Sequence, residues 1–175
     1  QANYNSGTGT TSLTFTYTIA AGDTDGNGIS VDANALSLNG GSLKDSSGNN
    51  AIITHAAVTD NSSFLVDTTA PAAPTINTVA IDDVINNSEQ AAVITGTNEA
   101  NATVALNIGG TIRAATVTGT SWSYTLTAAD ITAMGEGAET LSATQTDASG
   151  NTSTAGTRDI TVDTIAPTTT LAITS

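Results

Sequence analysis

A six-residue phrase that occurs twice limits how this chain can fold more than any other feature. Val66-Asp67-Thr68-Thr69-Ala70-Pro71 returns, with one substitution, as Val162-Asp163-Thr164-Ile165-Ala166-Pro167, 96 positions later. Recurrence at an interval of about one hundred residues is typical of tandem domains of that size. We therefore expect each copy to join the last strand of one domain to the first strand of the next. Each copy also places one carboxylate at the junction.

Around these copies, apolar and polar residues alternate with a period of two. Residues 13–19 alternate Leu, Phe, Tyr and Ile with Thr, and residues 121–126 alternate Trp, Tyr and Leu with Ser and Thr. Between the copies we expect one helical turn at 128–134 and seven strands, near 75–81, 90–96, 102–109, 111–117, 121–128, 138–146 and 155–163. Seven short, half-buried strands in about one hundred residues predict an immunoglobulin-like sandwich.

The first 66 residues hold fewer strands, which we expect near 11–19, 28–32, 35–44 and 50–66. Four strands are too few to close a sandwich. The predicted fold is therefore all-β, with tandem immunoglobulin-like β-sandwich domains of which the first is truncated at its N-terminus. Residues 1–66 form the C-terminal part of one repeat, 67–165 a complete seven-strand repeat, and 166–175 the first strand of a following repeat. The truncation reflects either the boundary of a fragment or strand exchange with a neighbouring molecule through 168–175.

The charge of the chain is almost all negative. Sixteen acidic residues face three basic ones (Lys44, Arg113 and Arg158), so the net charge is −13. This balance argues against binding nucleic acid or an anionic membrane, and it suits a chain that binds hard cations such as Ca²⁺. The chain has no Cys, which excludes disulfides and thiolate metal sites. No apolar run approaches the ~18 residues of a membrane span, and no signal peptide begins the sequence.

A second phrase recurs just before the expected last strand of each domain. Asp45-Ser46-Ser47-Gly48-Asn49 is matched by Asp147-Ala148-Ser149-Gly150-Asn151. In a seven-strand sandwich the chain enters at the end that carries the loop between the second and third strands (98–101 here) and the loop between the sixth and seventh strands (147–151 here). We therefore expect Asp67 to approach Glu99 and Asp147. Together with backbone carbonyls and Asn101, these side chains would supply the six to eight oxygens that calcium takes.

Two further groups of acids are candidate calcium ligands. Asp163, together with Asp82 and Asp83, would begin a second, incomplete site. The segment 23–28 places Asp23, Asp25 and Asn27 in the order of the first half of an Asp-x-Asp-x-Asn-Gly calcium loop. Asn34 stands where that loop has its bidentate Glu. The alternative for every one of these acids is a solvated turn residue, because Asp-x-x-Gly-Asn is a good turn sequence without any metal.

Catalytic chemistry finds no support in the sequence. His55 is the only His, so no triad or His-based metal site can form around it. The many Ser residues lack a visible base partner. Trp122 begins an alternating strand and is expected in the core, although it would offer a sugar-stacking platform if it were exposed.

Taken together, these phrases resemble the repeat regions of giant bacterial surface adhesins of the RTX or biofilm type. Residues 67–165 resemble a bacterial immunoglobulin-like repeat through the phrases at 66–71, 81–86, 94–97 and 147–151. Residues 1–66 are similar to the C-terminal part of a longer, related repeat through 13–18 and 38–41. The resemblance implies spacer domains stiffened by calcium at their joints. It maps Asp67 and Asp163 onto linker aspartates and Asp147 onto a loop ligand.

The sequence thus predicts a non-enzymatic extracellular spacer of a bacterial adhesin, on the cell surface or secreted, which supports adhesion or biofilm formation. Its expected partners are neighbouring repeats of the same polypeptide, with head-to-tail self-association through 168–175 as a further option. One alternative is a structural subunit of an extracellular filament that assembles by strand complementation. Another is a carbohydrate- or ice-binding module, which would use a regular Thr array such as that of strand 14–18.

Overall fold

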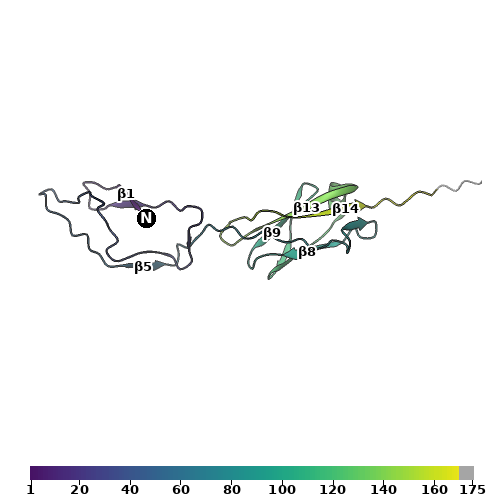
Figure 1. The fold of residues 1–175 in the computed structure, drawn as a ribbon, viewed down its shortest axis with the longest axis horizontal. Coiled ribbons are helices and arrows are strands. Elements are labelled where there is room, and N and C mark those ends of the chain that lie inside the picture. The colour runs from purple at the N-terminus through teal and green to yellow at the C-terminus, as the bar shows by residue number, and fades with distance from the viewer. Residues whose placement is uncertain (170–175) are drawn as a thin grey trace, which may run out of the picture. The chain divides into compact units, whose positions relative to one another are not determined.

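The computed structural model describes residues 1–169 and divides the chain into two compact units (Figure 1). The first unit is Gln1–Thr69, and the second begins at Ala70. Within residues 1–169 the structure is mostly strands, and no helix there is long and apolar enough to cross a bilayer. The predicted all-β class is confirmed.

The described part of the second unit holds two sheets. The larger sheet has the strand order β10 (Thr111–Ala114), β9 (Thr103–Ile108), β13 (Gly137–Thr146), β14 (Gly156–Asp163), β7 (Val84–Asn86). The smaller sheet has the order β11 (Thr116–Thr118), β12 (Ser121–Thr125), β8 (Val93–Thr97). Neighbouring strands run antiparallel, except that β7 lies parallel to β14.

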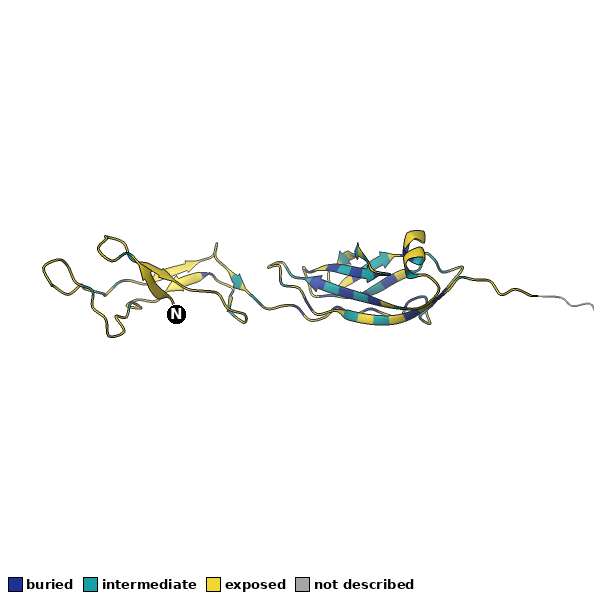
Figure 2. Ribbon diagram, turned by 90° about the horizontal axis from the view of Figure 1, so that it is seen from above, coloured by how far each residue is buried: buried dark blue, intermediate teal, exposed yellow. Residues whose placement is uncertain are grey.

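The core of the second unit lies between these sheets and is built by the alternation seen in the sequence. Every second residue is buried along β9, and along β13 from Leu141 to Gln145, and Figure 2 shows this alternation in the strands of the second unit. Trp122 is 2% exposed and belongs to this core, as predicted. The largest fully buried apolar side chains are Trp122, Ile85, Ile94, Leu106, Ile108, Leu141, Val79 and Val162. Burial of each such side chain contributes about 1.5–3 kcal/mol, so this unit has a substantial core.

The first strand of the second unit differs from the prediction of a strand at 75–81 followed by a loop. Residues 75–79 are extended and bond to β8, with Thr75 N–H to Thr97 O at 3.0 Å and Asn77 N–H to Thr95 O at 2.8 Å. The chain then turns through positive φ angles at Ala80, Ile81 and Asp83 and continues as β7 in the other sheet. Similarly, the predicted strand 111–117 is divided between β10 and β11, so that it contributes to both sheets.

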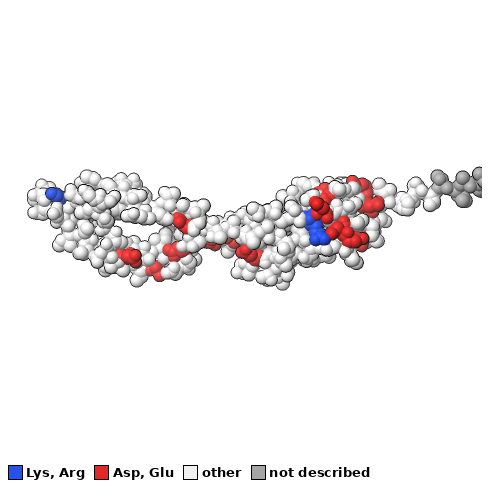
Figure 3. All heavy atoms as spheres, in the orientation of Figure 1, with Lys and Arg blue, Asp and Glu red and all other residues white. Residues whose placement is uncertain are grey.

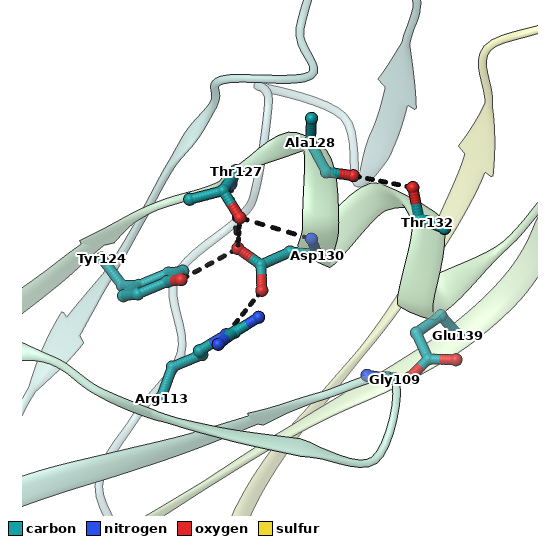
Figure 4. A network of polar contacts seen from close by, with 8 residues as sticks. All are labelled: Gly109, Arg113, Tyr124, Thr127, Ala128, Asp130, Thr132 and Glu139. Atoms are coloured by element: carbon teal, nitrogen blue, oxygen red, sulfur yellow. Dashed lines mark hydrogen bonds and ion pairs between the residues drawn. The ribbon is translucent and has the colours of Figure 1, made fainter.

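The predicted helical turn is present as α1 (Ala128–Met134). Thr127 caps it: its hydroxyl accepts from the N–H of Asp130, and the Asp130 carboxylate accepts from the N–H of Thr127 at 2.9 Å. The Asp130 side chain is fully buried, and Figure 4 shows it pointing toward Tyr124 and Arg113. It accepts from the Tyr124 hydroxyl at 2.8 Å and pairs with the Arg113 guanidinium at 2.7 Å. A buried carboxylate with several donors joins the helix to β10 and β12.

Acid titration tests this network. Burial raises the pKa of Asp130, but donors on Thr127, Arg113 and Tyr124 outweigh burial and hold the pKa at about 2. Because the pKa is lower in the folded chain than the ordinary 3.8, the network stabilises above pH ~4 and loses about 2 kcal/mol as the pH falls to ~2. We predict that Asp130→Asn flattens the pH dependence of unfolding in this window, as measured by the fluorescence of Trp122. Asp159→Asn, an exposed acid on β14, should leave the profile unchanged; equal profiles for wild type and Asp130→Asn would contradict the assignment.

The first unit contains short strand pairs and hardly any core. Antiparallel partners are β1 (Asn3–Ser6) with β2 (Thr14–Thr16), β3 (Thr24–Asp25) with β6 (Val66–Asp67), and β4 (Ile29–Val31) with β5 (Val58–Asn61). The strand expected at 35–44 does not form; only Lys44 bridges to Asn50. β1 and β3 were not predicted, because neither segment has an apolar alternation.

Large apolar side chains of the first unit are exposed, so the unit appears yellow almost throughout in Figure 2. Among residues 1–69, Gly28 alone is buried. Phe15 is 41% exposed and Phe64 61%. An open hollow of about 700 Å³ is lined by Tyr4, Leu13, Phe15, Leu36, Leu38 and Leu43, among others. The short strand pairs of this unit leave these side chains uncovered.

Trypsin digestion compares the stability of the two units, since the chain has only three basic residues after which trypsin can cleave. Lys44 is exposed in the first unit, whereas Arg113 and Arg158 lie in β10 and β14. Cleavage requires local opening, so we predict rapid cleavage after Lys44 and slow cleavage after the two arginines. Lys44 and Arg158 are both followed by Asp, which matches their local sequence. Mass spectrometry of timed digests gives the order; cleavage after Arg158 as fast as after Lys44 would contradict the difference in stability.

Candidate functional site

The segment that follows the first copy of the repeated phrase is held inside the second unit by a buried amide. Gln145 on β13 is 1% exposed. Its side-chain Nε2 donates to the carbonyl of Ala72 at 2.6 Å, and its Oε1 accepts from the N–H of Glu99 at 2.8 Å. The carboxylate of Glu99 accepts in turn from the N–H of Ala72 at 2.8 Å. Both backbone groups of Ala72 are thus satisfied by one loop and one strand of the same unit.

Close packing continues this attachment along the incoming segment, which we define as residues 70–79. The indole N–H of Trp122 donates to the carbonyl of Thr75 at 3.1 Å. A Cβ added at Gly96 would lie 1.9 Å from that same carbonyl oxygen, and one added at Gly156 would lie 1.8 Å from the carbonyl oxygen of Pro74. Only glycine leaves room for the backbone at these two places. The incoming segment therefore belongs to the second unit from its first residues.

Each copy of the repeated phrase also attaches to the unit that precedes it, through the Thr after its Asp. Thr68 accepts from the N–H of Gly22 at 2.8 Å and donates to the carbonyl of Asp23 at 3.0 Å. Thr164 donates through its N–H to the carboxylate of Glu136 at 2.9 Å, and its hydroxyl donates to the same carboxylate. In the first copy, Val66-Asp67-Thr68 thus belongs to the unit that it closes, and Ala70-Pro71 begins the second unit.

The second recurring phrase forms the same closed loop in both units. Oδ1 of Asp147 accepts from the N–H groups of Ser149 and Asn151, at 2.9 and 2.8 Å, and its Oδ2 accepts from the side chain of Asn151 at 2.9 Å. Asp45 makes the equivalent bonds to Ser47 and Asn49. Donation by the Asn side chain lowers the pKa of each Asp. This geometry is that of a turn-forming Asp, which was the alternative to a calcium ligand.

The acids predicted to begin a second site are not gathered together by the fold. The Arg158 guanidinium pairs with Asp83 through both Nε and Nη2, and its donation lowers the pKa of that carboxyl. Asp82 accepts from the N–H of Val84 at 3.1 Å. The pairing of β14 with β7 sets Asp163 opposite Asn86. A carboxylate already paired with a guanidinium does not suit a cation, so Asp83 does not fit the predicted calcium shell.

The acidic loop of the first unit lies beside the repeated phrase, because β3 pairs with β6 and sets Thr24 opposite Asp67. Asp25 accepts from the N–H of Gly28 at 2.9 Å, and Asp23 accepts from the Tyr17 hydroxyl at 2.6 Å. Asn27 donates to Asp60 at 2.6 Å. Asp60, which the sequence had not suggested, therefore lies beside this loop.

Within residues 1–169, three or more acidic or His side chains do not come close enough together to hold a metal ion. Figure 3 shows acidic side chains spread over both units, with the arginines of the second unit lying against acids. The predicted ligands Glu99 and Asn101 lie in the loop after β8, where Glu99 already bonds to Ala72. The Glu99 carboxylate is thus already engaged with the incoming segment.

Comparison with known proteins supports the fold and identifies the family. An adhesin that is stabilised by Ca²⁺ and helps an Antarctic bacterium reach out and bind ice is 27% identical over 89% of this chain, with a TM-score of 0.50. A bacterial immunoglobulin-like domain of the M. primoryensis ice-binding adhesin is 31% identical over 54% of this chain and 100% of that domain, with a TM-score of 0.37. The chain belongs to the immunoglobulin-like domains of large bacterial adhesins.

This adhesin chain spans less than half of two longer structures. It covers 44% of the Ca²⁺-stabilised adhesin and 40% of a structure from a 1.5-MDa bacterial ice-binding adhesin, to which it is 25% identical over 70% of its length with a TM-score of 0.39. Neither a protein-family model nor a curated protein matches the chain. The predicted resemblance and the predicted location at the bacterial surface are confirmed by this relationship.

Gln145 was missed by reasoning from sequence, although a signal was present. It lies on the same face of β13 as the buried Leu141 and Ala143, so a polar residue occupies a core position. We predict that Gln145→Leu leaves the Ala72 carbonyl and the Glu99 N–H without partners and lowers the free energy of unfolding by about 2–4 kcal/mol. Denaturant titration followed by Trp122 fluorescence measures the loss.

Gln90→Leu is the matched control for that change. Gln90 is only partly buried, and its side chain donates to Asn87 at the surface. Its replacement should alter the free energy of unfolding by no more than about 0.5 kcal/mol. Equal losses for the two variants would show that the buried amide does not hold the incoming segment.

Proposed function

We propose that this chain is a non-enzymatic extender of a bacterial adhesin, which spaces a binding domain away from the cell and so supports adhesion or biofilm formation. The observation that carries the proposal is the relationship to the Ca²⁺-stabilised adhesin over 89% of the chain. The repeated phrase supports it, since each copy is bonded through its Thr to the unit before it. In this proposal residues 67–165 are one complete repeat, 1–66 belong to the repeat before it, and 166–175 begin the repeat after it; residues 170–175 lie outside the described residues.

We propose further that calcium stiffens this array at the linkers. Hard cations take carboxylate and carbonyl oxygens, and the chain carries 16 acids against three basic residues. Asp67 at the linker, together with Glu99, Asn101 and Asp147, remains the predicted ligand set. Asp23, Asp25 and Asn27 form the second candidate, which Asp60 now joins. Asp83 is not part of the proposed ligand set, because its carboxylate is paired with the Arg158 guanidinium.

Self-association is a second candidate function, because the apolar side chains of the first unit are exposed. A strand supplied by another copy, such as 168–175, would cover part of them. In that case the chain would act as a subunit of a filament. A sugar-stacking role for Trp122 has no support, since this residue is in the core.

Calcium titration tests the proposal that calcium stiffens the array. At free calcium about 100-fold above the dissociation constant, one site stabilises the folded chain by about 2.7 kcal/mol, so we predict a higher melting temperature than in chelator. Asp67→Asn should reduce this shift, whereas Asp32→Asn, outside the predicted sites, should not. An unchanged melting temperature and unchanged solution dimensions would contradict calcium stiffening.

Light scattering on the same samples tests self-association, which a strictly monomeric chain at high concentration would exclude.

A further inference from the structure

The first and last strands of the second unit are tied directly to each other by one side chain. Arg158 lies on β14, the last strand. Its Nη2 donates to the hydroxyl of Thr78 at 2.9 Å on the incoming segment, and its Nε donates to Asp83 at 2.7 Å in the turn that follows. Asp83 is itself fixed to the incoming segment, since it accepts from the N–H of Val79 at 2.9 Å.

Backbone bonds reinforce this connection. The N–H of Thr161 on β14 donates to the carbonyl of Asp83 at 2.8 Å. Directly after it, β7 and β14 pair in parallel, with Thr161 opposite Val84 and Asp163 opposite Asn86. Parallel pairing of these two strands means that both run from the end where the chain enters this unit toward the end where it leaves.

This topology decides how tension acts on the unit. A pull on the chain before Ala70 and after Asp163 draws the incoming segment and β14 lengthwise in opposite directions. The hydrogen bonds between them are then perpendicular to the pulling direction and must break together. In a hairpin pulled open at one end, by contrast, the hydrogen bonds break one at a time. At the entrance, the bonds from Gln145 and Glu99 to Ala72 resist the same displacement.

We propose that the second unit is a force-bearing element in which Arg158 joins the first strand to the last, so that the unit resists stretching without bound metal. This goes beyond the extender function, and it rests on that proposed function only for the assumption that tension acts through the two ends. A different residue provides a comparison: Arg113 also forms an ion pair, through Nε to the buried Asp130, but it lies on β10 at the opposite edge of the sheet from β7.

Single-molecule pulling of the full chain in chelator tests the proposal. The chain has no cysteine, so Ala70→Cys and Ile165→Cys, both at exposed positions, set the pulling points across the second unit alone. We predict that Arg158→Gln raises the force-free unfolding rate about tenfold. Arg113→Gln should lower the melting temperature but change the mechanical unfolding rate no more than about twofold. Arg158→Lys keeps the charge but loses the paired donors, and it should unfold faster than wild type even if Arg158→Gln does not fold.

The proposal is overturned if variants at Arg158 unfold under force no faster than Arg113→Gln, or if the wild-type unit extends in chelator without a resolvable unfolding force. Since every measurement is made without calcium, an absent calcium effect on melting leaves this test intact. Conversely, equal mechanical unfolding rates for the Arg158 and Arg113 variants would not contradict calcium binding.

Discussion

The attachment of Ala72 to the second unit is the constraint on which the rest of this unit depends. The incoming segment crosses from the linker into the sandwich, where its backbone groups have no strand partner until Thr75. Gln145, which is 1% exposed, and Glu99 supply those partners. Once Ala72 is fixed, the segment can bond to β8, turn at Asp83 and continue beside β14.

The two halves of the repeated phrase therefore have different roles. The Thr after each Asp bonds to the unit that the phrase closes, and the residues after Pro71 bond to the unit that it opens. These bonds involve no metal. Calcium, if bound as we propose, would add to an attachment that each unit already makes by itself.

Much of the fold could be predicted because the alternation of apolar residues sets which strands exist and which face is buried. The burial of Trp122 follows from that pattern. The change of sheet at Ala80–Asp83 could not be predicted, since it depends on positive φ angles at residues other than Gly and on an ion pair with a residue 75 positions away. Among the candidate ligands, the Asp of each recurring loop has donors within its own turn, and periodicity cannot distinguish such a turn from a metal site.

The exchange rates of two backbone amides test the central claim most directly. In chelator, the N–H groups of Ala72 and Glu99 should exchange with solvent deuterium as slowly as the core amides of β13, because both donate to partners held within the second unit. Residue-resolved NMR in calcium-free buffer gives both rates. Exchange at these two positions as fast as in the exposed first unit would contradict a metal-free attachment of the incoming segment.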